Sequence, residues 1–384
     1  MSSIRKTAKM NEEMMSHHDE DPIAQVGRLL HSLPISYNGS KQRIFKWVGK
    51  ILLREAVDCQ VAVDGFSGSG IISALLAAAG LEVYSSDTLG SAYAMTVTMA
   101  GNPGFTMTDG QLDHVTSHSC IDGMLYDDEV GFIDDVPNVN DLHPGLFSRN
   151  ESLWMGRTRE KLNSIPIYER LIGHVALRSL ACIQPFGTPN GRSTFTHRIK
   201  QKRTYGKMCL GHYLNSSYEI EMDHWFRKYI NKFNDAVKVL SAERPGHSIC
   251  QRTDVLTLID RTADLDVGLA YFDPPYGGRG CRDYGVDYEV HEHIIGAQPV
   301  DSSDFFTAAS HASMFEEILD RCEDIPTVIF SYNNKAWETV DNIVDRLRYR
   351  GYTVDVESTG HVHGKHPIGE CQNPVTEYMI IAKR

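Results

Sequence analysis

Short apolar runs alternate with segments of helical spacing at both ends of the chain, and this pattern predicts strands and helices in turn. The predicted strands are 61–66, 81–87, 267–273, 326–332, 352–359 and 376–384. The predicted helices are 70–80, which Gly80 is placed to end, 304–322 and 337–351. Strands that alternate with helices form βαβ units, so the pattern predicts an α/β protein with a mostly parallel sheet.

This alternation fades in the middle of the chain, from about residue 101 to residue 245. We therefore predict a main domain of residues 31–105 and 246–384, interrupted by an inserted domain of residues 106–245. Residues 1–30 are polar and are expected to form a flexible lead-in.

The composition narrows the class of protein. The 384 residues are 41% hydrophobic, which allows a sizeable core, and no apolar run is long enough to predict a membrane-spanning helix. The first residues lack the apolar core of a signal peptide. Eight cysteines are scattered without a C-x-x-C pair, which favours reduced thiols over a disulfide framework or a zinc site. A cytoplasmic protein with no membrane contact is expected.

A glycine-rich turn, Asp64 to Gly70, follows the first predicted strand. Glycines let a backbone approach a ligand closely, although glycine turns are common in α/β proteins. Asp87 ends the next predicted strand, where a carboxylate can accept hydrogen bonds from both hydroxyls of a ribose or can cap a helix. Together, the turn and Asp87 favour a nucleoside site.

Two prolines follow a later predicted strand, in the sequence Asp273-Pro274-Pro275-Tyr276. Ligands of open α/β sheets bind beyond the carboxyl ends of strands, where this segment lies. The prolines fix φ and leave carbonyl groups that no helix uses, while Asp273 adds a carboxylate and Tyr276 a flat ring. Two acceptors beside a stacking face suit the amino group of a planar base. The alternative, a proline turn with a capping Asp273, is less favourable beside a candidate nucleoside site.

These motifs resemble the S-adenosylmethionine-dependent amino-methyltransferases of DNA. Segments 37–41, 330–334 and 376–383 are similar to the N-terminal motif, the segment after the catalytic motif and the last strand of the Dam-like adenine methylases. The motif order is similar to the family's alpha arrangement, in which a long insertion recognises the target. The resemblance covers both ends of the chain and implies a Rossmann-like methyltransferase sheet with an inserted target-recognition domain. The insertion matches poorly, so no target sequence is implied.

The resemblance also implies a set of residues that bind the cofactor S-adenosylmethionine. They are Tyr37, Lys41, Asp64, Phe66, Gly68, Gly70, Asp87, Asp254 and Asp273. Asp64 would lie near the methionine amino group, and Tyr37 and Lys41 over its carboxylate. Asp87 would hold the ribose and Asp254 the adenine ring. The alternatives are a strand-terminal cap for Asp254 and a solvated helix lysine for Lys41.

The implied catalytic residues are Asp273, Pro274, Pro275 and Tyr276. The lone pair of the adenine amino nitrogen is delocalised, and hydrogen bonds to Asp273 and the Pro274 carbonyl would direct it toward the methyl group, so that transfer needs chiefly positioning. Removing the base from a duplex costs a few kcal/mol, and stacking on Tyr276, at about 1–3 kcal/mol, would offset much of that. An N4-cytosine or RNA amino-methyltransferase, and a non-catalytic DNA-binding protein, remain alternatives.

Double-stranded DNA is the expected partner, although the formal net charge is −12. Contact would therefore come from a local basic segment, 191–207, which a solvated loop would also explain. Its basic residues are Arg192, Arg198, Lys200, Lys202, Arg203 and Lys207. Also within the insertion, Trp225, Phe226 and Tyr229 are expected to be core rather than a stacking platform. No metal site is expected, the acidic stretch 121–145 has no predicted role, and a partner restriction endonuclease is left open.

Overall fold

The computed structural model describes residues 21–35, 40–117, 149–183, 218–242, 246–275, 284–297, 311–361 and 375–384. Tyr37, Tyr276, the acidic stretch 121–145 and the six basic residues of 191–207 lie outside these described residues. Within the described ranges, no helix combines the length and the apolar character needed to span a membrane.

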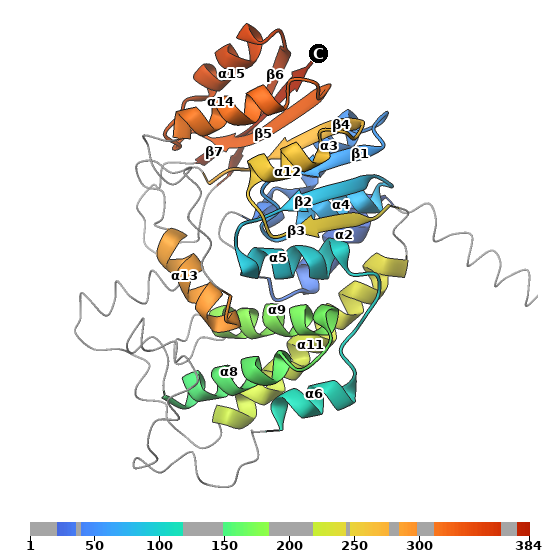
Figure 1. The fold of residues 1–384 in the computed structure, drawn as a ribbon, viewed down its shortest axis with the longest axis vertical. Coiled ribbons are helices and arrows are strands. Elements are labelled where there is room, and N and C mark those ends of the chain that lie inside the picture. The colour runs from blue at the N-terminus through green and yellow to red at the C-terminus, as the bar shows by residue number, and fades with distance from the viewer. Residues whose placement is uncertain are drawn as a thin grey trace, which may run out of the picture.

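A seven-stranded sheet forms the centre of the fold (Figure 1). Its strands are β1 Val61–Asp64, β2 Glu82–Ser86, β3 Ser248–Gln251, β4 Val267–Phe272, β5 Thr327–Asn333, β6 Thr353–His361 and β7 Val375–Lys383. The order is β3-β2-β1-β4-β5-β7-β6, with β1 to β5 parallel and β7 antiparallel to both β5 and β6. The predicted α/β class and mostly parallel sheet are confirmed. Strand β3 is not among the predicted strands, because its sequence is short and half polar.

Helices cover both faces of this sheet, and the alternation of side chains along each strand explains why. Leu269 and Tyr271 of β4 face one layer, while Ala270 and Phe272 face the other. The first layer contains α3 Phe45–Glu55 and α4 Ile71–Ala78, and the second contains α12 Val255–Thr262, α14 His311–Arg321 and α15 Val340–Tyr349. A strand with two buried faces reads as a continuous apolar run, as these strands do.

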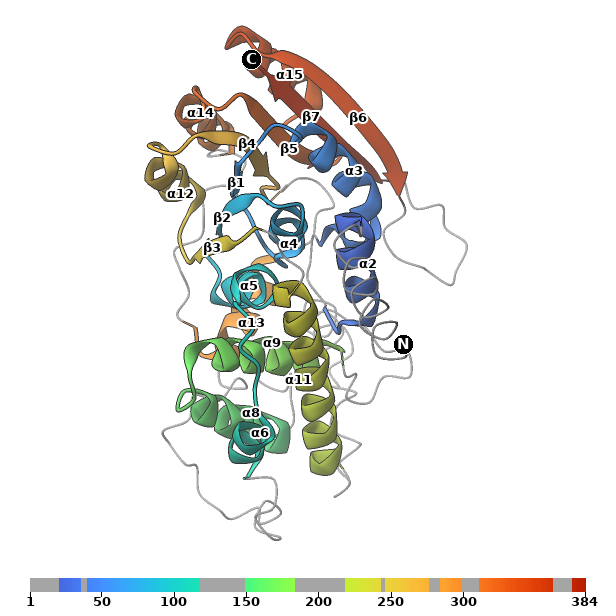
Figure 2. The same cartoon turned by 90° about the vertical axis from the view of Figure 1, so that its right-hand side faces the viewer.

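Further helices form a third layer beside the sheet, and Figure 2 shows most of them below β3 and α4, with α2 alongside α4. They are α2 Pro22–Ser32, α5 Gly90–Thr96 with η2 Val97–Gly101, α6 Asp109–Thr116, α8 Arg149–Leu162, α9 Ile167–Ile183, α11 Tyr218–Ala242 and α13 Tyr284–Ile295. They share one apolar core, in which Phe226 and Tyr229 are buried and Trp225 is partly buried. The expectation that these aromatic side chains form core is confirmed.

Two of these helices are not among the helices predicted from the sequence. Helix α2 begins at Pro22, inside the expected lead-in, and its apolar stripe buries Val26 and Leu30. Helix α13 follows the Asp-Pro-Pro segment in sequence, yet it packs against α8 and α9 of the insertion. Helices α8, α9 and α11, which lie in the predicted insertion, therefore share one core with parts of the chain on both sides of it.

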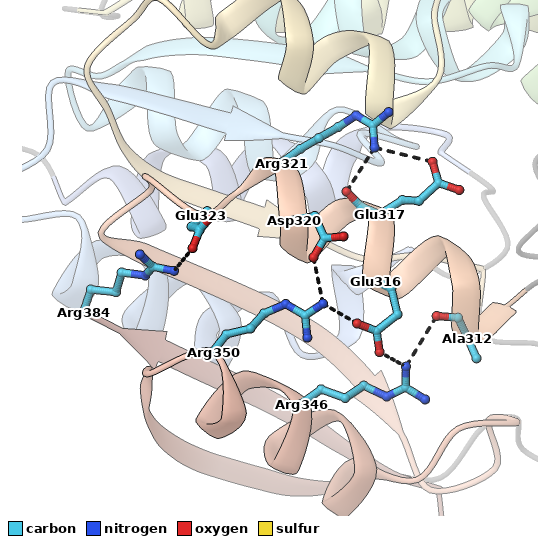
Figure 3. A network of polar contacts seen from close by, with 9 residues as sticks. All are labelled: Ala312, Glu316, Glu317, Asp320, Arg321, Glu323, Arg346, Arg350 and Arg384. Atoms are coloured by element: carbon cyan, nitrogen blue, oxygen red, sulfur yellow. Dashed lines mark hydrogen bonds and ion pairs between the residues drawn. The ribbon is translucent and has the colours of Figure 1, made fainter.

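A network of charged side chains joins α14 to α15 and to the C-terminus (Figure 3). The carboxylate of Glu316 bonds to both Arg346 and Arg350, and Arg350 also lies 2.8 Å from Asp320. Arg384 lies 3.8 Å from Glu323, two residues beyond the end of α14. The shared carboxylate makes Glu316 the centre of this network, which ties the two helices of one layer together.

We expect Glu316→Gln to lower the free energy of unfolding by about 0.5–1 kcal/mol at low salt, because two arginines lose one shared charge. The loss stays small because Glu316 is 38% exposed and solvent screens the pairs. Urea unfolding at low and high salt measures it, and the difference should shrink at high salt. Glu323→Gln, which removes one longer contact, is the matched control. A loss that did not depend on salt would contradict an electrostatic origin.

Candidate functional site

Four aspartates lie at the carboxyl ends of neighbouring parallel strands, which we name the carboxyl edge. Asp64 ends β1, Asp87 follows β2, Asp254 follows β3, and Asp273 follows β4. The chain runs outward from β1 to β3 and then crosses to β4, so the strand order reverses between β1 and β4. Ligand sites of open α/β sheets lie at such a reversal. The fold thus brings predicted residues from distant segments to one edge.

Asp64 is completely buried beneath this edge. Its Oδ2 accepts a 2.6 Å hydrogen bond from the Ser73 hydroxyl, whereas no described atom donates to Oδ1. Burial raises the pKa of the Asp64 carboxyl to about 7, and the nearby charges of Asp273 and Asp87 raise it further against the Ser73 bond. An inward-facing carboxylate oxygen without a donor suits a cationic or hydrogen-bonding ligand group.

Backbone geometry and packing explain in part why glycines occupy the turn after β1. Gly68 and Gly70 have φ of 50° and 71°, values that other residues seldom adopt. A Cβ at Gly70 would lie 2.6 Å from the Thr96 Cα atom. Phe66, between them and β1, packs edge-on against the Phe272 ring at 6.5 Å. The glycines of this turn are therefore explained by the fold itself.

Asp87 fastens this turn to the next strand. Its Oδ2 accepts from the Gly68 backbone N–H and its Oδ1 from that of Leu89, both at 3.0 Å. Burial raises the pKa of the Asp87 carboxyl to about 6, although these two backbone hydrogen bonds lower it. Each carboxylate oxygen keeps one further lone pair, so Asp87 can still accept two hydroxyl groups.

Asp254 caps helix α12. Its oxygens accept from the Thr257 backbone N–H at 2.9 Å and from the Thr257 hydroxyl at 2.6 Å. Partial burial raises the pKa of the Asp254 carboxyl, but the hydrogen bonds from Thr257 outweigh burial and leave the pKa below its usual value. The capping alternative is therefore confirmed, and a contact with an adenine ring stays a prediction.

Asp273 forms an ion pair with Lys41, a residue far away in the sequence. The Lys41 Nζ atom lies 2.7 Å from Asp273 Oδ1, and the two side chains are only 7% and 18% exposed. The alternative of a solvated lysine is wrong, because Lys41 begins the short helix η1 (Lys41–Arg43) with its side chain buried against the carboxyl edge. Pro274 is buried beside Asp273, and Pro275 is half-buried.

Sequence reasoning did not select Ser73, Arg252 or Glu292 as site residues. Ser73 carried a readable signal, because it is the one polar residue in the apolar helix α4 and needs a buried partner. Arg252 and Glu292 lie 3.6 Å apart beside Asp87 and carry no local sequence signal. Only the packing of α13 against α5 brings Glu292 to the carboxyl edge.

The raised pKa of Asp64 predicts a pH-dependent stability. Its folded pKa, about 7, exceeds its ordinary value of 3.8, so its contribution is fully present below pH 4 and is lost as pH rises through 7. Between pH 5 and pH 7 this loss is on the order of 2 kcal/mol. Asp64→Asn should remove that component while keeping an acceptor for Ser73. Urea unfolding at both pH values measures it, and identical pH profiles for the two proteins would contradict the raised pKa.

Comparison with known proteins adds no assignment. No family model matches the chain, and no curated protein matches it significantly. The residues at the carboxyl edge and their geometry are therefore the basis for a functional proposal.

Proposed function

We propose that this chain is a DNA adenine N6-methyltransferase that uses S-adenosylmethionine. In this proposal the sheet is a Rossmann-like methyltransferase sheet, and residues 106–245 are the inserted target-recognition domain. One observation carries the proposal: Asp273-Pro274-Pro275 follows β4 directly beside Asp64 and the glycine turn of β1, where the strand order reverses. The motif for a base and the turn for a nucleoside cofactor therefore adjoin.

The carboxyl edge fits the functional groups of S-adenosylmethionine. The buried Asp64 Oδ1 atom, without a described donor, suits the hydrogen-bond donors of its methionine end. The two remaining lone pairs of Asp87 suit the paired hydroxyls of its ribose. When bound, S-adenosylmethionine supplies a methyl group already activated by a sulfonium. The protein then has to hold the acceptor nitrogen in line with it.

Asp273 would orient the target amino group. Its Oδ1 accepts from Lys41, and a carboxylate has several acceptor positions, one of which would take an N–H of the base. The Pro274 carbonyl would accept the second N–H. The two prolines end the strand and do not begin a helix, so no regular backbone hydrogen bond uses this carbonyl. With both hydrogens held, the nitrogen lone pair would point out of the ring plane, toward a bound methyl donor. Transfer would form the N–C bond as the C–S bond breaks, the sulfur would keep that electron pair as a neutral thioether, and the surplus N–H proton would leave through Asp273 to water.

The partner in this proposal is double-stranded DNA, which the insertion would contact. Its described helices share one core with α5 and α13, so a surface carried by them would belong to the same packed body as the proposed cofactor site. The basic segment 191–207 lies outside the described residues, and its contact with phosphates stays a prediction from charge. The target sequence stays open, as does an associated restriction endonuclease.

The direct test is transfer of radiolabelled methyl from S-adenosylmethionine to duplex DNA. We expect the label in N6-methyladenine, and we expect Asp273→Ala to lower turnover at least a hundredfold because the amino group loses its acceptor. Asp266→Asn is the control, since this exposed aspartate precedes the opposite end of β4. Circular dichroism of both variants checks the fold.

Each alternative has its own outcome in this experiment. Label in N4-methylcytosine or in RNA would replace the substrate and keep the reaction. DNA binding without transfer would indicate a non-catalytic protein on this fold. Unchanged turnover in Asp273→Ala would refute the role given to Asp273.

Lys41→Met should separate two roles for the lysine. Because Lys41 bonds to Asp273, we expect its loss to lower kcat at least tenfold while cofactor affinity changes less than threefold. Steady-state kinetics and calorimetry measure the two quantities, with the exposed Lys46→Met as control. A large loss of cofactor affinity at unchanged kcat would instead favour contact with the methionine carboxylate.

A further inference from the structure

Two carboxylates accept hydrogen bonds from backbone N–H groups at the start of helix α5. The backbone N–H of Leu89 donates to Asp87 Oδ1 at 3.0 Å. The next two N–H groups, of Gly90 and Ser91, donate to Glu292 Oε2 at 2.7 Å and to Oε1 at 2.8 Å. Glu292 belongs to α13 and is 1% exposed, so it reaches α5 from across the core. Three successive donors are thus divided between Asp87 and Glu292.

This division determines how much hydrogen-bonding capacity Asp87 retains. With Leu89 on one oxygen and Gly68 on the other, one lone pair remains on each. The N–H groups in the first turn of a helix have no partner within the helix and seek an external acceptor. If Gly90 and Ser91 lost Glu292, the nearest carboxylate on the same turn would be Asp87, which can rotate to cap them. Its capacity for a ligand would then fall.

We propose that Glu292 is a positioning residue of the cofactor site, which satisfies the first turn of α5 and thereby keeps both oxygens of Asp87 available to a ribose. This inference rests on the proposed function, because it takes Asp87 as the ribose-binding carboxylate. It adds a residue outside the recognised motifs. It also assigns a helix that follows the catalytic segment to the support of the cofactor.

Arg252 and Gly90 support the contact between the Glu292 carboxylate and α5. The Arg252 Nη2 atom lies 3.6 Å from Glu292 Oε2, and its Nε donates to the Thr88 carbonyl at 3.3 Å, so one guanidinium holds both the carboxylate and the Asp87 turn. A Cβ at Gly90 would lie 2.6 Å from the Ala297 Cβ and 3.0 Å from Glu292 Oε2. The close approach of α13 therefore requires the glycine.

The residues beside Glu292 fix α13 on either side. His291 lies 3.2 Å from the buried Arg178 guanidinium of α9, and the His293 carbonyl accepts a 2.7 Å bond from Arg159 of α8. Consecutive positions of α13 thus contact three different helices. Glu292 is held in place by the insertion while its carboxylate acts on α5.

The test compares two ligands by calorimetry on the full chain: S-adenosylhomocysteine and its 2′-deoxyribose analogue. We expect the wild-type protein to prefer the ribose form about tenfold, equivalent to about 1.4 kcal/mol. In Glu292→Gln one carboxylate oxygen becomes a donor and releases one N–H of α5. We expect this variant to bind the ribose form at least threefold more weakly, to bind the deoxy form within twofold of wild type, and so to lose most of the preference.

The matched control is Glu289→Gln, an exposed position one turn earlier in α13, which should leave the preference unchanged. Asp87→Asn should abolish the preference in both backgrounds. Equal weakening of both ligands in Glu292→Gln would overturn the inference and leave the proposed function standing. Equal binding of both ligands by the wild-type protein would overturn the ribose role of Asp87 together with the inference. If the wild-type protein bound neither ligand, with or without DNA, the proposed function itself would fail.

Discussion

The burial of carboxylates gathered at one sheet edge is the constraint on which the surrounding structure depends. Burial disfavours the charged form of a carboxyl group, and it is the main cause of the raised pKa of Asp64 and Asp87. A buried charge is costly unless it is paired or hydrogen-bonded. The four aspartates are compensated in different ways. Asp64 has a raised pKa, Asp254 accepts from Thr257, Asp87 accepts backbone N–H groups, and Asp273 pairs with Lys41. The edge therefore retains acceptors without an excess of unbalanced charge.

The partners of these aspartates lie at different separations along the sequence. The cap of Asp254 is local, and Ser73 reaches Asp64 from the helix that follows its strand. Lys41 must come from before β1 to meet a residue after β4, which the sheet allows because those two strands are neighbours. Glu292 comes from a helix that the insertion holds. The longer the separation, the more the site depends on the completed fold.

The predicted insertion accordingly helps to hold the carboxyl edge. Its described helices, α8, α9 and α11, share a core with α2, α4 and α5, and α13 joins them after the chain has returned to the sheet. Buried charged groups at this junction, such as Arg178 beside His291, carry a desolvation cost, so their partners have to stay in register. A change in the packing of the insertion would therefore reach α5 and Asp87 through α13.

The sequence by itself determined the α/β class, six of the seven strands, and the segments that carry the candidate chemistry. It could do so because apolar periodicity and turn residues act over a few positions, and the strand runs at 61–66 and 267–273 show both. Strand β3 was not predicted, because half of its residues are polar. Helix α2 was not predicted either, because its apolar stripe follows a polar lead-in.

Only the tertiary structure decided which residues meet at the carboxyl edge and what occupies their oxygens. The contact of Lys41 with Asp273 is not among the sequence predictions, and Arg252 and Glu292 belong to no predicted motif. Such pairings follow from strand order and helix packing, which join segments that are distant in the sequence. Local sequence patterns carry no signal for them, because the hydrogen bond to Gly90 exists only once α13 and α5 are packed together.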